Sequence, residues 1–518
     1  MKLDFVPLAL NPGVMSRTTV LLVAIGFIPL VLMFAAVWAR HALLRKKRRS
    51  RMAKGLLRAL AAITFPWRPF ESRWLRNRFR NRSKTSRRAS KNRYNFATAG
   101  GDTADATVAL ARRSDLLYPG AVAVAASIQD YALSADEAWP FYEDDEISAV
   151  SEVLRSGKVN QWTGNGVLAF EEEYSALLDG RSAIALANGS LALELALRTF
   201  GIGPGDEVIV TPRTFVASVS CVRLVGATPV FAEVDRQSGN ITPESIDVAI
   251  TSRTRAVIPV HLGGWPADMP GIMAVAKARG IYVIEDCAQA HGALIQGQPV
   301  GSFGDAAAFS FCQDKIISTG GEGGLLAFRD AAAFEWAWSF KDHGKSRSKA
   351  LQKSVQPGFR WLHDSVGTNW RMTEIAATIG RIQLEKLPEW HAVRMRNARI
   401  WASALRPVSG LRIPLPKPGF LHAFYRLYAY LDVDSFSNEA LRNRILKAAA
   451  DADLRVFSGS CSEVFREGAF HDLQVPTLDV AKELGDTSLA FEVHPTLDSR
   501  RLRVRAEKVA DIIQSVLR

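Results

Sequence analysis

The sequence predicts an α/β protein built on a mostly parallel sheet. Between residues 183 and 328, short apolar strands alternate with segments of helical periodicity, as in βαβ units. The strands are apolar on both faces, which is expected when helices cover a sheet on both sides. With 518 residues and 48% hydrophobic composition, the chain can form two or three globular units with a sizeable core.

The expected elements follow one another in a regular order. A helix at 144–156, with Gly157 as its stop, precedes a second helix at 170–178. Strands are expected at 183–187, 207–210, 229–234, 256–260, 281–286 and 306–311, with helices at 191–200, 216–225, 243–250 and 269–279. A helix at 373–387 can continue to 405. A strand at 425–431 and helices at 438–450 and 506–516 then indicate a smaller α+β domain, so we expect a large domain at 136–405 and a small one at 406–518.

The first 135 residues are of a different kind. After a tail at 1–17, residues 18–39 are an uncharged run of 22 residues, long enough to cross a bilayer as a helix. A basic cluster at 45–49 follows directly, so the bulk of the chain is expected in the cytoplasm, anchored by one pass through the inner membrane. Positive charge after the apolar core disfavours a cleaved signal peptide. The other alternative is a start codon assigned too far upstream, with residues 1–130 missing from the working protein.

The net charge of +13 is concentrated in one segment. Residues 40–93 hold 20 Lys and Arg against the single acid Glu71, whereas residues 94–518 carry a net charge of −7. Residues 40–135 are therefore expected to be a basic, largely disordered linker that can touch anionic lipid, without specific nucleic-acid binding. The four cysteines lack the spacing of a zinc site or a disulfide framework. No metal is predicted, and the cysteines are interpreted as small core residues.

Lys315 gives the most specific indication of the chemistry that this protein can perform. It stands between the apolar strand at 306–311 and the glycine-rich run at 319–324. Burial near its base would disfavour the charged ammonium and leave an amine able to form an imine. Such a lysine is well placed to form a Schiff base with pyridoxal phosphate (PLP). A lone lysine is nevertheless more often solvated surface, and the glycines also fit a plain turn.

Two further segments fall where a PLP site needs them. Asn188, Gly189 and Ser190 join a strand to a helix, and a helix N-terminus offers free N–H groups to a phosphate; ordinary helix capping explains the same residues. Asp286 ends an apolar strand, where a buried carboxylate needs a cation such as a pyridinium nitrogen. The competing interpretation is that Asp286 caps the next element. His291, in the same segment, is interpreted as structural.

Taken together, these segments resemble the DegT/DnrJ/EryC1/StrS family of sugar aminotransferases, which share the PLP-dependent fold type I of aspartate aminotransferase. The resemblance covers about residues 139–518. It rests on the segments 188–190, 211–215, 285–289, 310–315, 319–324 and 369–372. It implies a large domain with a sheet of the seven-stranded type. The family normally starts near the equivalent of Trp139, so the N-terminal extension is a departure.

The resemblance also implies roles for the site residues. Lys315 would hold the cofactor and move the substrate proton, Asp286 would pair the pyridine nitrogen, and Gln289 would contact the phenolic oxygen of the ring. Phe215 would stack on the ring. The phosphate would be held by Gly189, Ser190 and Ser310, and Asn369 would reach into the site of the partner subunit, which implies a homodimer.

Lysine at position 315 favours transamination, because some relatives that carry histidine there catalyse dehydration. The chain is therefore expected to transfer an amino group, from L-glutamate, to a nucleotide-linked ketosugar for polysaccharide, O-antigen or aminosugar biosynthesis. His422 and Tyr425 are candidates for sugar contacts, with packing roles equally open. Two alternatives stand beside this function: a PLP-dependent sugar dehydratase or epimerase, and a membrane-tethered regulatory protein that keeps the fold without turnover.

Overall fold

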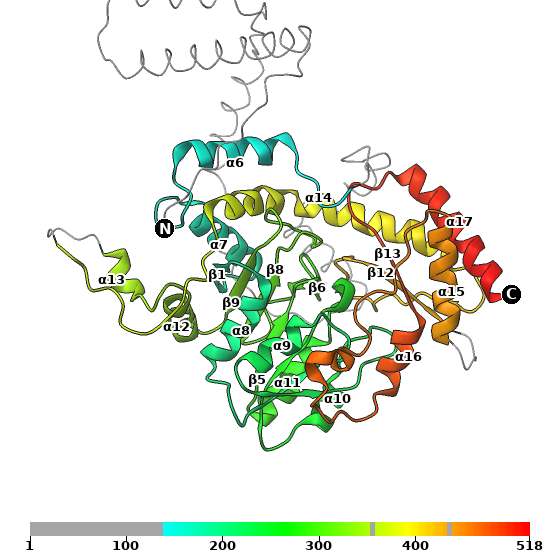
Figure 1. Ribbon diagram of the computed structural model, residues 1–518, viewed down its shortest axis with the longest axis horizontal. Coiled ribbons are helices and arrows are strands. Elements are labelled where there is room, and N and C mark those ends of the chain that lie inside the picture. The colour runs from blue at the N-terminus through cyan, green and yellow to red at the C-terminus, as the bar shows by residue number, and fades with distance from the viewer. Residues whose placement is uncertain (1–137, 353–357, 433–437) are drawn as a thin grey trace, which may run out of the picture. The chain divides into compact units, whose positions relative to one another are not determined.

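The computed structural model describes residues 138–352, 358–432 and 438–518 (Figure 1). The expected tail at 1–17, the apolar span at 18–39 and the basic linker at 40–135 lie outside the described residues. Within the three described ranges, no helix combines the length and the apolarity needed to cross a membrane.

A seven-stranded sheet forms the centre of the fold, in the order β1-β9-β8-β5-β4-β2-β3. Its strands are β1 (Ser182–Leu186), β2 (Glu207–Val210), β3 (Thr228–Phe231), β4 (Thr254–Ile258), β5 (Tyr282–Asp286), β8 (Ala306–Ser310) and β9 (Gly324–Phe328). The pairs β2–β3, β2–β4, β4–β5 and β5–β8 are parallel, as predicted. β9 runs antiparallel to both β1 and β8, so the sheet is mixed.

β9 has no counterpart among the strands expected from the sequence. It returns from β8 through the glycine-rich segment without a crossover helix, and so short a return requires the antiparallel direction. Gly324 permits a close approach there, because a Cβ atom at this position would lie 2.2 Å from the Asn188 carbonyl oxygen. These glycines therefore serve the packing of β9 beside β1.

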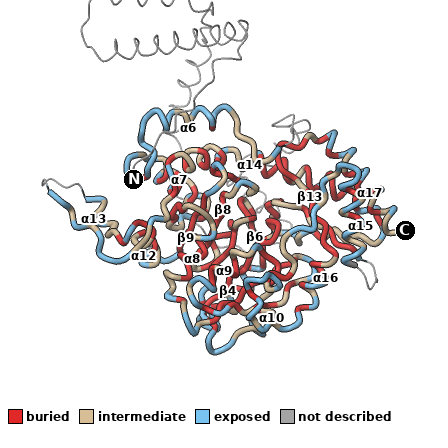
Figure 2. Tube along the Cα trace, viewed as in Figure 1, coloured by how far each residue is buried: buried red, intermediate tan, exposed pale blue. Residues whose placement is uncertain are grey.

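The helices that accompany the sheet are α7 (Gly166–Leu177), α8 (Gly189–Thr199), α9 (Ala217–Leu224), α10 (Pro243–Ala249), α11 (Met269–Arg279), α12 (Ala331–Lys341) and the short α13 (Arg347–Leu351). The helices from α7 to α11 agree with the expected ones to within a few residues, whereas α12 and α13 have no counterpart among the expected helices. Local signals set several ends: Thr242 and Ser245 form a capping box at α10, and α11 runs from its cap Asp268 to Gly280 in the left-handed conformation. The sheet strands between the helices are almost entirely buried (Figure 2).

One long helix, α14 (Glu374–Leu405), runs from the large sheet region to the C-terminal part of the chain. The prediction that the helical stretch continues to residue 405 is therefore correct, and the helix passes through Pro388 without ending. Its first half packs against α6 (Asp144–Ser156) and α7, and its last turns pack against α17 (Ser499–Leu517).

The C-terminal part has a core of its own. A three-stranded sheet of β10 (Leu411–Arg412), β12 (Leu427–Leu431) and β13 (Ser488–Phe491) lies with α15 (Asn438–Asp451), α16 (Asp479–Thr487) and α17. Trp401 and Leu405 of α14 belong to this second core, so α14 serves both parts. The domain division at 405 and 406 stays a prediction. A small sheet of β11 (Phe420–Leu421), β6 (Leu294–Ile295) and β7 (Gln298–Pro299) joins the C-terminal segment to the large sheet region.

Candidate active site

The predicted site residues follow the carboxyl ends of strands that run in the same direction. Gly189 follows β1, Phe215 follows β2, Asp286 ends β5, and Ser310 and Lys315 follow β8. In a parallel arrangement these ends meet at one edge of the sheet, where ligands of α/β proteins bind. The fold therefore gathers residues that are far apart in the sequence.

The turn between β1 and α8 lies against the end of β8. Asn188 caps α8, its Oδ1 accepting a hydrogen bond of 3.0 Å from the Leu191 N–H. Gly189 allows the close approach, since a Cβ atom there would be 2.7 Å from Ser310 Cβ. Ser190 is exposed in the first turn of α8. Capping and anion binding are thus compatible, because Asn188 occupies one amide of a helix end whose other amides lack intrahelical acceptors.

Asp286 is a buried carboxylate that accepts hydrogen bonds from neutral groups. Its side chain accepts hydrogen bonds from Ser218 Oγ at 2.8 Å and from the Ala288 N–H at 3.1 Å, and Ser218 also contacts the Thr214 hydroxyl at 2.7 Å. Asp286 is 5% exposed and has no ion pair within the described part of the chain. Burial raises the pKa of Asp286, although the hydrogen bonds oppose this. The Ala288 contact is the local capping considered above, and the carboxylate remains suited to a cationic partner.

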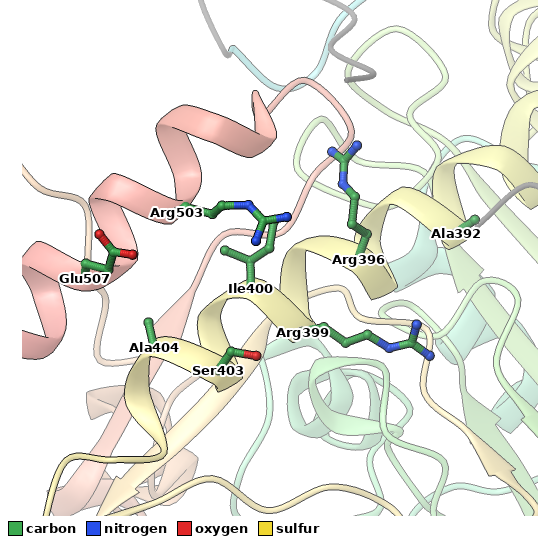
Figure 3. Close-up of a pocket in the computed structure, with 8 residues that line it drawn as sticks. All are labelled: Ala392, Arg396, Arg399, Ile400, Ser403, Ala404, Arg503 and Glu507. Atoms are coloured by element: carbon green, nitrogen blue, oxygen red, sulfur yellow. The ribbon is translucent and has the colours of Figure 1, made fainter. Parts of the chain in front are cut away.

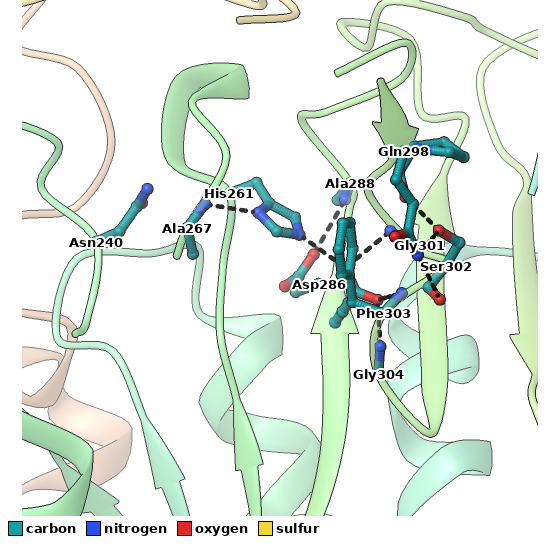
Figure 4. A network of polar contacts seen from close by, with 12 residues as sticks. Asn240, His261, Ala267, Asp286, Ala288, Gln298, Gly301, Ser302, Phe303 and Gly304 are labelled. Carbon is teal, nitrogen blue, oxygen red and sulfur yellow. Dashed lines mark hydrogen bonds and ion pairs between the residues drawn. The ribbon is translucent and has the colours of Figure 1, made fainter. Parts of the chain in front are cut away.

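The neighbouring residue Glu285 belongs to a second buried network of polar contacts. Figure 4 shows its partner His261 and the backbone groups around it. His261 Nε2 lies 3.3 Å from Glu285, and the Ala267 N–H donates to His261 Nδ1, so Nε2 carries the hydrogen. Glu285 also accepts backbone N–H groups of Gly301, Phe303 and Gly304. Burial alone would raise the pKa of Glu285, but His261 and these amides hold it below its ordinary value.

Three side chains of this network are spaced like metal ligands, but the ligand atoms of two of them are already engaged in hydrogen bonds. His261, Glu285 and Cys287 bring their ligand atoms within 4.8 Å of one another. Both Glu285 oxygens already accept N–H groups, and both His261 nitrogens are engaged. We assign the network a structural role: it fixes the ends of β4 and β5 and thereby the position of Asp286.

Lys315 contacts its neighbour Asp314 and two residues that are distant in the sequence, Trp139 and Tyr425. Its Nζ lies 3.2 Å from Asp314 Oδ1 and 5.1 Å from the centre of the Tyr425 ring. The Tyr425 hydroxyl donates to the other Asp314 oxygen, and Trp139 Nε1 donates to the Lys315 backbone carbonyl at 2.9 Å. The lysine side chain is 15% exposed, so it is neither solvated surface nor sealed in the core.

The two candidates for sugar contacts lie in different environments. Tyr425 lies at the candidate active site, where its hydroxyl donates a hydrogen bond to Asp314. His422 is a packing residue: its ring stacks on Phe424, its Nδ1 accepts the Phe424 N–H at 2.7 Å, and burial lowers its pKa to about 3. His422 is therefore neutral at physiological pH.

The remaining expected residues lie around this edge. Gln289 is buried and accepts the Gly263 N–H at 2.7 Å through Oε1, which leaves the donors of its amide for another group. Phe215 is 63% exposed, an unusual position for a phenylalanine unless something covers it. Asn369 is exposed on a loop that runs beside β1, where the Ala187 N–H donates to the Trp370 carbonyl at 3.0 Å.

His291 occupies the structural place expected of it. Its Nε2 lies 2.9 Å from the Ser310 carbonyl and its Nδ1 lies 2.7 Å from the Tyr174 hydroxyl. Burial lowers its pKa to about 4, so the neutral ring donates to Ser310 and accepts from Tyr174. This bond fixes the end of β8. Of the four unpaired cysteines, Cys221 and Cys287 are buried and the other two are half-buried.

Sequence reasoning missed the residues that act through others. Ser218, which holds Asp286, stands four residues after Thr214, and this helical spacing was the available signal. Asp314 stands next to Lys315 in the sequence, but its hydrogen bond to Tyr425 joins residues 111 positions apart, and no local pattern predicts it. The contact of Trp139 with Lys315 spans 176 residues and was equally hidden.

The residues present fit PLP. A buried carboxylate that has no ion pair within the described ranges suits a pyridinium. The α8 N-terminus beside Ser310 suits a phosphate, and exposed Phe215 offers a face for an aromatic ring. Lys315 is accessible to an aldehyde at the same edge of the sheet.

Known proteins agree with this assignment. The sequence model of the DegT/DnrJ/EryC1/StrS aminotransferase family matches residues 140–510. UDP-N-acetyl-3-dehydro-alpha-D-glucosamine 3-aminotransferase from Acidithiobacillus ferrooxidans is 36% identical over 354 residues, which are 68% of this chain and 89% of that protein.

Solved structures share the aminotransferase-like α/β fold with its mixed sheet. An aminotransferase from Psychrobacter cryohalolentis is similar with a TM-score of 0.71 and 47% identity, covering 74% of this chain and 99% of that one. DesV from S. venezuelae, in complex with a ketimine intermediate, is similar with a TM-score of 0.62 and 31% identity, covering 72% of this chain and 94% of that one. Proteins of this kind depend on PLP, which matches the cofactor predicted from the sequence.

Proposed function

Because the chain belongs to the DegT/DnrJ/EryC1/StrS aminotransferase family, and so is a PLP-dependent sugar aminotransferase, we propose that it transfers an amino group from L-glutamate to the keto carbon of a nucleotide-linked sugar. The observation that carries the proposal is that one edge of the sheet holds both an accessible lysine, Lys315, and a buried carboxylate, Asp286, that has no ion pair with any described residue. A structural protein gains nothing from burying such a carboxylate.

We assign the cofactor contacts as follows. PLP, when bound, supplies an aldehyde that takes up the amino group and a ring that accepts negative charge from the substrate. Lys315 Nζ would hold the aldehyde in the resting enzyme, and Asp286 would keep the ring nitrogen protonated. Gln289 donates its amide to the phenolic oxygen, and Phe215 covers the ring.

The phosphate is assigned to Gly189, Ser190 and Ser310, which the close approach of β8 to the α8 N-terminus supports. Helix amides bind anions without a counter-cation, so the turn holds the phosphate while Lys315 remains available for chemistry.

Lys315 also moves the proton. With the donor bound, Nζ would take the proton from the donor's α-carbon and pass it to the reacting carbon of the cofactor, and it would make the same transfer in reverse on the ketosugar. Asp314 lies 3.2 Å from Nζ, where it would balance the ammonium that Lys315 becomes on taking this proton, and the Tyr425 hydroxyl fixes that carboxylate. The pair therefore positions the released lysine.

We also propose a homodimer in which Asn369 completes the partner's site. Asn369 is exposed, and its loop carries the exposed side chains Phe359, Trp361 and Val366. Apolar side chains clustered on a loop indicate a protein interface. The expected anchoring of the catalytic part in the cytoplasm by residues 18–39 likewise stays a proposal, which membrane fractionation of the full chain tests.

The substrate is proposed from the relatives. UDP-linked 3-ketosugars come first in the panel, because the Acidithiobacillus relative is named for one. The purified enzyme is given L-glutamate and each nucleotide ketosugar, and 2-oxoglutarate and the amino sugar are measured. Sustained release of 2-oxoglutarate over many turnovers that requires both substrates supports the proposal.

The same assay separates the alternatives. Conversion of the sugar without 2-oxoglutarate points to a dehydratase or epimerase. A protein that binds PLP but is inert toward every amino donor would instead be the regulatory protein considered above.

A further inference from the structure

The loop that carries Lys315 contains no helix or strand. It runs from the end of β8 to the start of β9, at residues 311–323. Within this loop, the Lys315 N–H donates to the Cys312 carbonyl at 3.0 Å, which is a local turn contact. Five single bonds of about 1.5 Å separate Nζ from Cα, so Nζ lies about 6 Å away and a backbone rotation of about 10° moves it by about 1 Å. The position of Nζ therefore depends on contacts that hold the loop from outside.

The first residues of the described fold supply two such contacts. Trp139 Nε1 donates to the Lys315 carbonyl at 2.9 Å. The Tyr142 hydroxyl lies 3.0 Å from Ser318 Oγ. Ser318 is fully buried, and its N–H donates to the Gln383 side chain of α14 at 2.8 Å. The loop is thus held at two points that are three residues apart, by two residues with the same spacing.

Trp139 is itself fixed by packing. Its ring meets Trp390 of α14 edge-on, with 5.2 Å between the ring centres, and stacks on His494 at 6.1 Å. The Arg394 guanidinium lies over the indole, 5.1 Å from the ring centre. Ala392, between Trp390 and Arg394 in α14, lines a groove beside α17 instead (Figure 3). Trp139 does not line that groove, and three side chains determine where its N–H points.

Arg394 connects this indole to the other side of the lysine. Arg394 is 1% exposed, and its Nη1 donates to the Phe424 carbonyl at 3.3 Å. Its Nε and Nη2 have no hydrogen-bond partner among the described residues. A buried cation needs compensation, and the face of an indole is the best aromatic partner for it. Tyr425, the next residue after Phe424, donates to Asp314 beside the lysine.

Lys315 is therefore held at both ends. Trp139 fixes its carbonyl, and Asp314 lies 3.2 Å from its Nζ. A reacting group has to lie within about 0.5 Å of its productive position. A displacement of about 1 Å, even one caused by a change far from the chemistry, can cost about 10²-fold in rate.

On the basis of the function proposed above, we propose that Trp139 is a positioning residue for Lys315. Its indole N–H fixes the backbone of the lysine and thereby sets where Nζ meets the cofactor aldehyde and the substrate proton. Tyr142 supports the same loop at Ser318. Residues 139–142, where the N-terminal extension enters the described fold, thus belong to the active site although they contact a backbone carbonyl and a serine hydroxyl.

Hydrogen exchange of the full-length, cofactor-free protein tests the contact. Trp139→Phe keeps an aromatic ring under Arg394 and removes the N–H, so peptides covering 311–323 should exchange about tenfold faster than in the wild type. The matched control is Trp401→Phe. It removes an indole N–H that donates to the Glu492 carbonyl at the same distance of 2.9 Å, within the C-terminal core, and should leave the exchange of 311–323 unchanged.

Tyr142→Phe is a second variant that removes only a hydroxyl. It should also speed the exchange of peptides 311–323, because Ser318 loses its partner. This change leaves Trp139 and its packing in place, so it tests the loop contact even if Trp139→Phe lowers the yield of folded protein.

Spectroscopy and kinetics with PLP test the consequence for Lys315. Trp139→Phe retains the lysine and should reach the full absorbance at about 410–430 nm, but the rate at which this absorbance develops should fall about tenfold. The kcat should fall about tenfold with the KM for L-glutamate unchanged, because Nζ moves while the substrate contacts stay. Trp401→Phe should change neither rate.

Wild-type exchange of 311–323 in both Trp139→Phe and Tyr142→Phe would overturn the proposal. Faster exchange with an unchanged kcat, or an equal loss of kcat in Trp401→Phe, would overturn it as well, since Trp139 would then be a merely structural residue. A wild-type protein that develops no absorbance with PLP would reject the proposed function instead. The exchange measurement needs no cofactor and would still decide whether Trp139 holds the loop.

Discussion

Replacing Asp286 with asparagine is expected to stabilise the cofactor-free protein while removing its activity. The carboxylate is 5% exposed, accepts two hydrogen bonds and has no ion pair within the described residues. An unpaired buried carboxylate carries a desolvation penalty of several kcal/mol. Asparagine keeps an acceptor oxygen, and the Ser218 hydroxyl, which also contacts Thr214, can turn to accept from the new amide.

The expected gain is the difference between two effects. Each of the two hydrogen bonds weakens by roughly 1 kcal/mol when its acceptor becomes neutral. The relieved desolvation is larger, so we expect the free energy of unfolding to rise by about 1–3 kcal/mol at pH 7.5. Activity should fall roughly 10²- to 10³-fold, because the ring nitrogen loses its counter-charge.

The gain should depend on pH in a defined direction. Burial raises the pKa of Asp286 above its unfolded value of about 3.9. The folded state therefore binds the proton more tightly, and the wild-type protein loses stability as pH rises through the folded pKa. The advantage of the Asp286→Asn variant is largest at neutral pH and shrinks toward pH 4.

Urea denaturation of both cofactor-free proteins at pH 5, 6 and 7.5 measures this. Asp511→Asn, at an exposed position on α17, is the matched control and should change stability by less than about 0.5 kcal/mol. A variant less stable than the wild type at pH 7.5, or a difference that does not vary with pH, would mean that the carboxylate is already compensated and that the argument for a cationic ligand is wrong.

Four further changes are expected to have measurable effects. Lys315→Ala should abolish the absorbance at about 410–430 nm that PLP gives when bound to the lysine, and an unchanged spectrum would refute the assignment. Tyr425→Phe removes the hydroxyl that fixes Asp314 and should lower kcat about tenfold with little change in stability; equal loss of both would indicate mere packing. Glu374→Ala leaves two α7 amides without their acceptor and should lower the free energy of unfolding by about 2–3 kcal/mol in a denaturation assay. Arg213 is fully buried, and the nitrogens of its guanidinium have no hydrogen-bond partner in the described ranges, so Arg213→Met should stabilise the cofactor-free protein by about 1–3 kcal/mol; destabilisation would point to a bound anion.

Elements whose ends are marked by neighbouring residues could be predicted from the sequence. α11 has the residue range expected of it, because Asp268 and Gly280 mark its ends by themselves. The order of strands and helices and the position of Lys315 after an apolar strand likewise depend on neighbouring residues. The family motifs add the cofactor, because each is a short contiguous segment.

Contacts between segments that are distant in the chain could not be predicted from the sequence. α7 begins at Gly166, four residues before the expected start, because Glu374 caps it from 208 residues away. β9 is antiparallel because the chain returns from β8 without a crossover helix, and its place between β1 and β8 depends on packing across the sheet.

The sequence by itself determined the repeating units of the sheet and the residues that can do amine chemistry, since both are written in short runs of the chain. Only the tertiary structure decided what surrounds them: the Ser218 hydroxyl on Asp286, the Tyr425 hydroxyl on Asp314, and the packing role of His422. The physical reason is that hydrogen bonding and desolvation act between atoms close in space, and sequence patterns record only closeness along the chain.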